Sequence, residues 1–303
     1  MKTPVWKSVS CRKAQRMMPD VCWPMRPVQK LITPLVLVLP LLVAMPLSGQ
    51  AREEAAQEAR SQRDGMHRPS MVGLGVVAVP EYSGADSYRV LPVPFFDVSV
   101  GERLNVGLIQ GVRLDLSPAT ATRWRAGPLL RYLPGRADRG VLRPLREQRG
   151  GLAAGGFVAY QAGPVRLGAE LETPVSGDIH GARASVSAMM MGRLGARSFY
   201  TLGPTLIWHG DNRANRLYGL DEAEANTLGL SAFHADAGVD SVRFMGSVTR
   251  ALDQRWVLTG FAGVGWLVGD AADSPLVRDA GRREQGVVGF GLMYRLGGAQ
   301  GAP

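Results

Sequence analysis

The 303-residue sequence contains few of the residues that form disulfides in exported domains or bind metal ions. It has two cysteines, Cys11 and Cys22, and four histidines, and no lysine follows Lys30. The lack of cysteine after residue 22 excludes a disulfide framework and Cys-containing metal sites from most of the chain. The histidines do not have the spacing of a metal-ligand cluster, so we expect neither a metal nor another cofactor.

The first part of the chain has the composition of a secretory signal peptide. Basic residues outnumber the single acid Asp20, an apolar run follows at 31–47, and small residues come after it. A transmembrane anchor is the alternative, but the run is short for a bilayer and contains three prolines. We therefore expect residues 1–51 to be removed on export, with translation starting at Met1 or at Met25.

Loss of this segment changes the charge and removes nucleic acid from the expected partners. The chain has 35 basic and 26 acidic residues; 7 and 1 of them lie in 1–51, so 28 and 25 remain. The high isoelectric point therefore reflects the N-terminal segment and not a basic binding domain. Residues 52–70 are charged and rich in alanine, which predicts a flexible lead-in.

From residue 71 on, apolar residues recur at every second position, which is typical of β-strands with one apolar face. The clearest stretches are 103–116, 165–172, 184–190 and 287–296. Together with weaker stretches they predict about twelve strands, with ten as the alternative. The weaker stretches are 71–79, 88–100, 121–132, 152–161, 197–209, 227–234, 239–249 and 255–268.

A soluble β-sandwich shows the same alternation as a transmembrane β-barrel. The residues on the polar faces of the strands distinguish the two folds. Arg113 and Asp115 share one polar face, and Arg166, Glu170 and Glu172 share another. Charges of both signs along single strands suit the interior of a transmembrane barrel, whose outer face is apolar. We therefore interpret these five residues as lumen-facing charges.

Two tryptophans support the membrane interpretation. Trp256 and Trp266 lie on the same face of one strand, ten residues apart. At about 3.3 Å per residue they are separated by roughly 33 Å, which fits the two aromatic girdles of a tilted membrane strand. We predict an all-β fold, an antiparallel transmembrane β-barrel over 71–296, followed by a C-terminal tail at 297–303.

One long connection is rich in arginine. Its ordinary interpretation is a solvated loop, and the alternative is a patch that binds anionic partners. Counting strands from a periplasmic N-terminus puts 134–151 and 210–226 on the periplasmic side, although periplasmic turns are usually short. Either the predicted number of strands before these loops is wrong by one, or the long loops of this barrel face the periplasm. The candidate interaction patch consists of Arg136, Arg139, Arg143, Arg146 and Arg149.

Residues for a catalytic triad can be chosen from the sequence, but nothing in the sequence indicates that they meet in space. His209 has Asp211 and Asn212 nearby in sequence and Ser198 upstream, and His234 has Ser231 and Asp236. Such sets arise by chance in a chain rich in serine and aspartate, and a triad is defined by geometry. We therefore expect that the protein is not an enzyme.

Residues 80–92 (PEYSGADSYRVLP) resemble the opening motif of the MipA/OmpV family, and 273–277 (DSPLV) are similar to a later motif of that family. The resemblance covers roughly 71–296. It implies an outer-membrane barrel of a Gram-negative bacterium that is not an enzyme. It also implies a scaffold that joins a membrane-bound lytic transglycosylase to a bifunctional murein synthase. The sequence departs from the family at 218–220, Tyr-Gly-Leu where Tyr-Phe-Gly-Val is usual, and at Leu296, where phenylalanine is usual.

The favoured function is thus a non-catalytic scaffold or interaction protein of the outer membrane, linked to peptidoglycan synthesis. Outer-membrane lipid or lipopolysaccharide, the transglycosylase and the murein synthase are the expected partners. A small-solute pore is the first alternative, because the inward charges would line a channel or would cancel one another and plug it. A lipid-modifying enzyme is the second.

Overall fold

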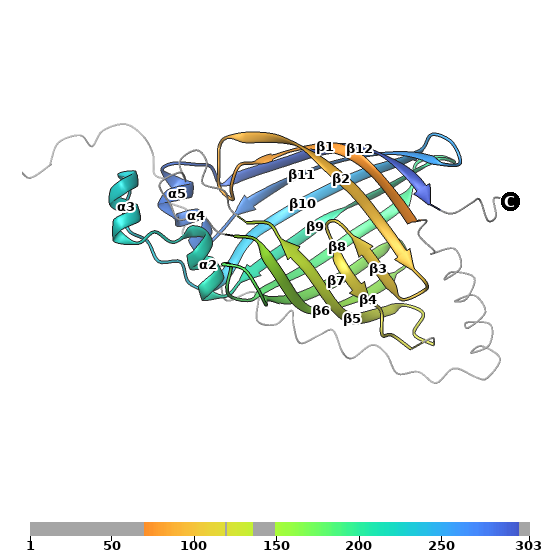
Figure 1. Ribbon diagram of the computed structural model, residues 1–303, viewed down its shortest axis with the longest axis horizontal. Coiled ribbons are helices and arrows are strands. Elements are labelled where there is room, and N and C mark those ends of the chain that lie inside the picture. Colours follow the sequence, from red (N-terminus) through yellow and green to blue (C-terminus); the bar gives the residue numbers. More distant parts are fainter. Residues whose placement is uncertain (1–69, 119, 136–148, 297–303) are drawn as a thin grey trace, which may run out of the picture. The chain divides into compact units, whose positions relative to one another are not determined.

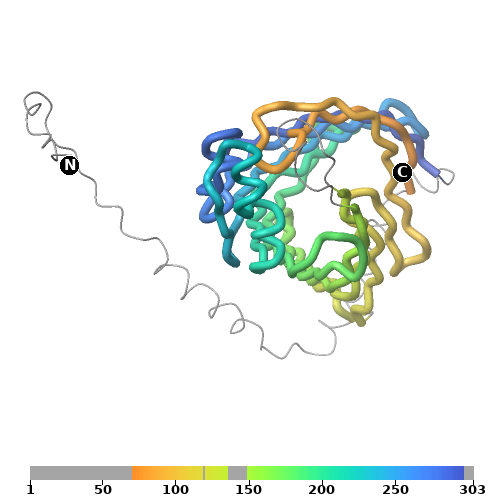
Figure 2. Tube along the Cα trace, turned by 60° about the vertical axis from the view of Figure 1, so that its left-hand side comes forward, coloured from red at the N-terminus to blue at the C-terminus, as the bar shows by residue number. Residues whose placement is uncertain are grey.

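The computed structural model describes residues 70–118, 120–135 and 149–296. Twelve antiparallel strands form a closed barrel in which β1 pairs with both β2 and β12, and Figure 2 shows them as a ring around a central interior. The predicted fold class and strand number are confirmed. The strands are β1 (Ser70–Pro80), β2 (Tyr88–Val100), β3 (Leu104–Gly107), β4 (Gly111–Leu114), β5 (Trp124–Leu133), β6 (Gly151–Ala162), β7 (Val165–Pro174), β8 (Arg183–Arg193), β9 (Ser198–His209), β10 (Gly238–Ala251), β11 (Trp256–Leu267) and β12 (Glu284–Leu296).

The expected signal peptide and tail lie outside the described residues, as does the lead-in except for Ser70. No helix in the described ranges is long and apolar enough to cross a membrane.

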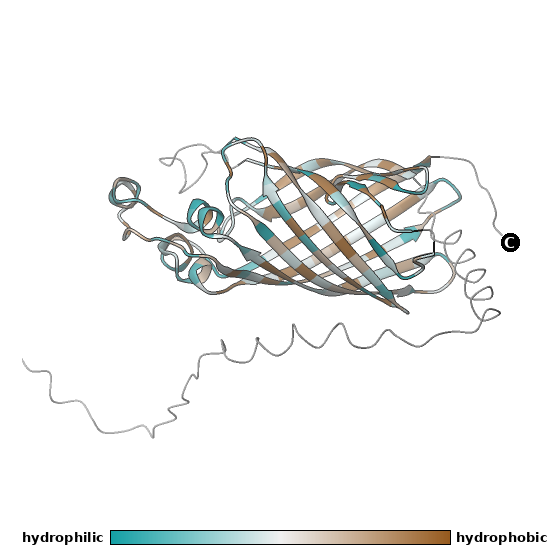
Figure 3. Cartoon of the chain, turned by 90° about the horizontal axis from the view of Figure 1, so that it is seen from below, coloured by the Kyte–Doolittle hydropathy of each residue, from teal (hydrophilic) through white to brown (hydrophobic). Residues whose placement is uncertain are grey.

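Side chains alternate between the two faces of the wall, as the period of two requires. On β12, Val288, Phe290 and Leu292 are exposed on the outside, whereas Met293 is buried on the inside. Figure 3 shows this alternation along the strands and the more hydrophilic loops at one end. An apolar outer face over a mixed interior is the arrangement of a barrel in a membrane.

Two of the expected strands are wrong, and the two errors cancel in the total. Residues 103–116 form a hairpin of two strands, β3 and β4, because Gly111 adopts a φ of +71° that allows a tight turn. Leu104 pairs with Leu114, so even-numbered residues face the same side on both strands. The apolar–polar alternation therefore continues through the turn, and the sequence looks like one strand. Residues 227–234 are not a strand: α3 (Glu222–Leu228) covers their start, and Gly229 ends that helix in the left-handed conformation.

The corrected strand order moves the long connections to one end of the barrel (Figure 1). The described residues 134–135 and 149–150, together with 210–237 and 268–283, lie at the end that we call the loop end. The opposite end, called the short-turn end, holds brief turns such as 163–164 and both ends of the barrel chain, Ser70 and Leu296. The strand count therefore no longer places the long loops on the periplasmic side.

The loop end carries the remaining helices, which form a cap with its own apolar core. Buried Tyr218 and Ala214 pack with Leu267 and Val277, and Leu220 packs with Leu276 in an adjoining cluster. The cap helices besides α3 are α2 (Asp211–Tyr218), α4 (Asp270–Asp273) and α5 (Pro275–Arg278).

This topology makes a prediction about orientation. A protease site inserted after Ser231, which is exposed at the loop end, should be cut by protease added to intact cells, because outer-membrane barrels keep short turns periplasmic and long loops outside. The matched control places the same site after Gly195, in an exposed short turn. It should be cut once the outer membrane has been permeabilised. The reverse pattern would show that the long loops face the periplasm.

Candidate functional site: the charged interior and the loop cap

A network of arginines and glutamates lies inside the barrel. Arg113 on β4 bonds to Glu170 on β7, and these strands are not neighbours, so the contact crosses part of the interior. Arg131 on β5 lies 2.6 Å from Glu170 and 2.9 Å from Glu172. Arg183 on β8 approaches Glu172 to 3.4 Å. Three guanidinium groups thus surround two carboxylates, and the charges are shared across four strands.

Burial makes this network a strong constraint on the fold. The Glu172 side chain is 1% exposed and those of Arg131 and Glu170 are 15% and 19% exposed. The guanidinium carbon of Arg113 lies 5.2 Å from the centre of the Phe157 ring, a cation–π distance. Removal of one partner from such a pair leaves a poorly solvated charge, which is more costly than the pair is stabilising.

The sequence placed three of these residues on polar faces but did not reveal their partners. Arg131 and Arg183 were missed. Both face the same side of the sheet as the two glutamates, and Arg183 is the direct cross-strand partner of Glu172. Asp115 contacts Arg125 at 3.3 Å nearer the short-turn end. Arg166 lies nearer the short-turn end of β7, in register with Gln161 and Met189 on the neighbouring strands.

The wall opposite the network is lined by aromatic rings and glycines. Phe95 on β2 and Phe261 on β11 meet edge to face with their ring centres 6.2 Å apart. A side chain at Gly75 or Gly291 would collide with the Phe95 ring, so these glycines make room for it. The interior therefore has the Arg–Glu network on one side and the Phe95–Phe261 aromatic pair on the other.

Tyr218 joins the cap to the barrel. Its hydroxyl donates to Asp240 at 2.7 Å and lies 2.9 Å from the Ser83 hydroxyl, and its carbonyl accepts from the Ser274 hydroxyl at 2.6 Å. Burial raises the pKa of Tyr218 well above its usual value, and the nearby Asp240 carboxylate adds to the shift. The phenol therefore remains a hydrogen-bond donor at neutral pH.

The most specific sequence motifs meet at this residue. Ser83 belongs to 80–92, Ser274 belongs to 273–277, and Tyr218 opens the stretch 218–220. Gly84, with a φ of +97°, lies against Val277 and accepts a backbone hydrogen bond from Arg282. These motifs thus serve to build the cap.

The triad considered for His209 with Ser198 does not form. Ser198 and His209 lie at opposite ends of β9, about 36 Å apart at roughly 3.3 Å per residue. His209 is buried with its Nδ1 3.2 Å from Asp240, within the Tyr218 network. His234 and Asp236 are 3.6 Å apart and well exposed to solvent.

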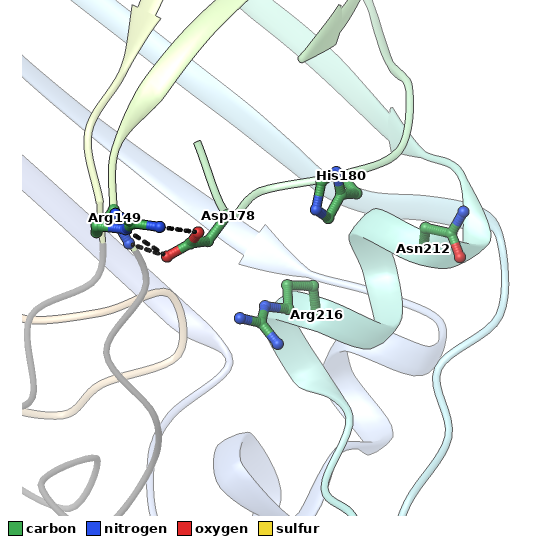
Figure 4. A pocket seen from close by; sticks show the side chains of 5 residues that line it. All are labelled: Arg149, Asp178, His180, Asn212 and Arg216. Atoms are coloured by element: carbon green, nitrogen blue, oxygen red, sulfur yellow. Dashed lines mark hydrogen bonds and ion pairs between the residues drawn. The ribbon is translucent and has the colours of Figure 1, made fainter. Parts of the chain in front are cut away.

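A polar pocket of about 650 Å³ opens among the loops, as Figure 4 shows. Arg149 donates to Asp178 from its backbone N–H at 2.9 Å and from its guanidinium group at 3.3 Å, and these bonds lower the pKa of Asp178. Asn212 and Arg216 enter from α2, and His180 lies beside them. Arg149 is the one member of the predicted arginine patch that the structure describes; Arg136, Arg139, Arg143 and Arg146 lie outside the described residues.

Aromatic side chains on the outer face lie near both ends of the wall. Trp256 and Trp266 are exposed at opposite ends of β11. The Trp256 ring is 5.3 Å from that of Tyr294, and Trp124 is 4.6 Å from Tyr160, all near the short-turn end. In the described part of the chain, no group of three His, Cys, Asp or Glu is placed to hold a metal.

A closed barrel with an apolar outer face, a charged interior and long loops at one end is an outer-membrane β-barrel protein. Within this class, the chain belongs to the family described as MltA-interacting protein MipA, whose model matches residues 72–296. The resemblance seen in the sequence is confirmed. No curated protein matches the sequence.

Solved outer-membrane proteins resemble the chain only distantly. An outer membrane channel from Pseudomonas putida F1 is 13% identical, with a TM-score of 0.37 over 75% of this chain and 96% of its own. The CymD monoaromatic hydrocarbon channel is 11% identical, with a TM-score of 0.33 over 85% and 95%. At these scores the fold assignment rests on the strand pairing described above, and function is not transferred.

Replacement of Tyr218 tests the link between the cap and the barrel. Tyr218→Phe removes a buried donor, so the unfolding free energy at pH 7 should fall by about 1–3 kcal/mol. Tyr82→Phe is the matched control, because that hydroxyl makes a 3.4 Å contact to the Ala280 carbonyl, and its effect should be smaller. Urea unfolding in detergent micelles measures both.

The pKa of Tyr218 adds a pH dependence to the same experiment. Since this pKa is raised above its unfolded value near 10, the stabilisation is present below about pH 10 and is lost as pH rises toward the folded-state value. The difference between wild type and Tyr218→Phe should therefore shrink above pH 10. A difference that stays constant up to pH 11 would contradict this role.

Proposed function

We propose that the protein is a non-catalytic scaffold of the outer membrane whose short-turn end docks peptidoglycan enzymes in the periplasm. The family supplies one partner class, because its description names an interaction with MltA, a lytic transglycosylase. A bifunctional murein synthase is the second partner that we propose. Export through a cleaved signal peptide at 1–51 is part of the same proposal.

The observation that supports docking is a ring of basic residues at the short-turn end. Six arginines there are exposed, whereas the exposed acids in the same turns are Glu102 and Asp253. Such an excess attracts an acidic protein surface and speeds its association. The members of this basic rim are Arg103, Arg123, Arg193, Arg197, Arg250 and Arg255.

The cap helices at the loop end have an excess of acids, unlike the basic rim, which supports a division of roles between the two ends. Acids outnumber bases in the four cap helices and their N-cap and C-cap residues. The acids are Asp211, Asp221, Glu222, Glu224, Asp270, Asp273 and Asp279, and the bases are Arg213, Arg216 and Arg278. We propose that this end faces outward among lipopolysaccharide, with Trp256 and Trp266 in the two membrane girdles. The arginine patch at 136–149 would then contact lipopolysaccharide phosphates.

Capture from membrane extracts tests the docking proposal. The unmodified barrel, immobilised in detergent, should retain a lytic transglycosylase or a murein synthase. The triple variant Arg103→Gln, Arg197→Gln, Arg255→Gln should retain at least 10-fold less, because the basic rim has lost half its charge. The binding should also weaken as salt rises, since exposed charges are screened.

The matched control removes three exposed arginines at the loop end, Arg278, Arg282 and Arg283, by the same substitution. This variant should bind like the unmodified barrel. Equal loss in both variants would point to a general charge effect, and retention by the rim variant would contradict docking at the short-turn end.

A small-solute pore is the second candidate function, and the interior charges are what favour it. The ion pairs project inward, however, and Arg113 reaches across to Glu170 beside Phe157. We therefore expect the unmodified barrel to give small conductance steps in planar bilayers and Arg113→Ala to raise them several-fold. Arg125→Ala, nearer the short-turn end, is the control. Large, stable steps in the unmodified protein would favour the pore over the scaffold.

A further inference from the structure

A buried arginine of the cap has two donor atoms that lack a partner. Arg213 on α2 is 7% exposed, and its Nε and Nη1 atoms make no hydrogen bond within the described residues. Buried polar groups of folded proteins almost always have a hydrogen-bond partner, and it is costly to remove a charged group from water without one. The Arg213 guanidinium group therefore needs an acceptor that the described part of the chain does not supply.

The carboxylates near Arg213 are engaged by other residues. Glu172 and Asp240 are the acids whose charges act on Arg213. Two arginines of the wall contact Glu172, at 2.9 and 3.4 Å, and Asp240 accepts hydrogen bonds from the Tyr218 and Ser241 hydroxyls. Neither acid forms an ion pair with Arg213 in the part of the chain that the structure describes. Within these residues Arg213 is therefore a buried cation without a direct counterion.

A second arginine without a counterion lies on the inner wall. Arg243 on β10 pairs with Thr205 on β9 and with Gly265 on β11. It points inward, because its neighbours Val242 and Phe244 are exposed on the outer face. No acid in the described ranges forms an ion pair with it. Arg243 is exposed although it points into a closed barrel, so space that water can enter lies beside it in the interior (Figure 2).

The wall beside Arg243 carries hydroxyl groups. Ser187 on β8 pairs with Thr205 on β9, and Thr205 pairs with Arg243, so the three residues form one inward-facing row. On the other side of Arg243, a Cβ atom at Gly265 would lie 3.0 Å from the Arg243 Cγ, so this glycine makes room for the arginine stem. Hydroxyl and guanidinium groups both donate hydrogen bonds. The row is therefore a set of donors without a carboxylate among them.

Arg183 on β8 connects the two arginines. Its charge interacts with that of Arg243 on the wall and with that of Arg213 on the cap. Three guanidinium groups from α2, β8 and β10 thus share the loop end of the interior. Within the described residues, Glu172 is the one carboxylate in contact with any of them, at 3.4 Å from Arg183. Such an excess of positive charge in a confined space attracts an anion.

We propose that the barrel interior beneath the cap binds a small oxyanion of the phosphate class between Arg213 of the cap and Arg243 of the wall. Both guanidinium groups donate to its oxygens, since arginine forms strong, charge-assisted hydrogen bonds with phosphate. Ser187 and Thr205 donate to the oxygens that remain. The bound anion joins α2 to β10 and so fastens the cap to the barrel. This site is separate from docking at the basic rim.

Access of anions to the interior can be measured with single cysteines, since the sequence has none after Cys22. Met189→Cys, two residues from Ser187 and on the same inner face of β8, carries a bimane fluorophore in the barrel in uncharged detergent. Iodide should quench it at least threefold more strongly than caesium, relative to the same ratio at Ser231→Cys on the exposed cap. Equal ratios at the two positions, or no quenching by iodide at position 189, would overturn the proposal.

Inorganic phosphate is the probe for the site itself. It should protect the label at position 189 from iodide saturably, and Arg243→Gln should raise the phosphate concentration needed at least 10-fold. Because Arg243 is exposed, its replacement leaves no buried charge unpaired. The matched control is Arg278→Gln, which removes a cap arginine that is paired with Asp279 at 2.8 Å. This control should bind phosphate like the unmodified barrel, and an equal loss in both variants would overturn the site.

The contribution of the cap is tested with Arg213→Gln. Phosphate should raise the urea midpoint of the unmodified barrel, because a ligand that binds the folded state stabilises it, and should not raise that of the variant. An equal rise in both would show that the cap does not hold the anion. Heat-dependent gel mobility checks that every variant folds. Arg243→Gln should still retain murein enzymes at the basic rim, so the two proposals fail separately.

Discussion

The structure depends on one constraint, that backbone hydrogen bonds in hydrocarbon must be made within the protein. A sheet satisfies it by closing on itself, and here β1 closes onto β12 over nine residue pairs. Closure of an even number of antiparallel strands brings Ser70 and Leu296 to the same end. The same topology makes successive connections alternate between the two ends, and the long connections of this chain belong to the loop-end set.

The interior and the cap turn this closed sheet into a specific molecule. Ion pairs among β4, β5, β7 and β8 fix one side of the wall from within, where the charged side chains are largely buried and their mutual attraction is stronger than in water. The cap is fixed by hydrogen bonds that converge on Tyr218 from two distant loops. The charged network and the cap meet near α2, where Arg213 is buried and its pKa is lowered by burial, opposed by Glu172.

The alternation of apolar and polar residues was sufficient to predict the barrel, because neighbouring residues of a strand face opposite sides of the wall. It was insufficient at 103–116, where the hairpin preserves the alternation, and at 227–234, where a short helix and a loop imitate it. The partners of Glu170 and Glu172 were hidden for a different reason. Their identity depends on which strands lie side by side, and that information is not local. Tyr218 gave no sign of its role beyond its place in a family motif.

Docking of a partner at the basic rim needs a rigid surface. The short β3–β4 hairpin completes the wall at that end by pairing with β2 and β5, so the proposed docking surface stands on strands that are paired on both sides.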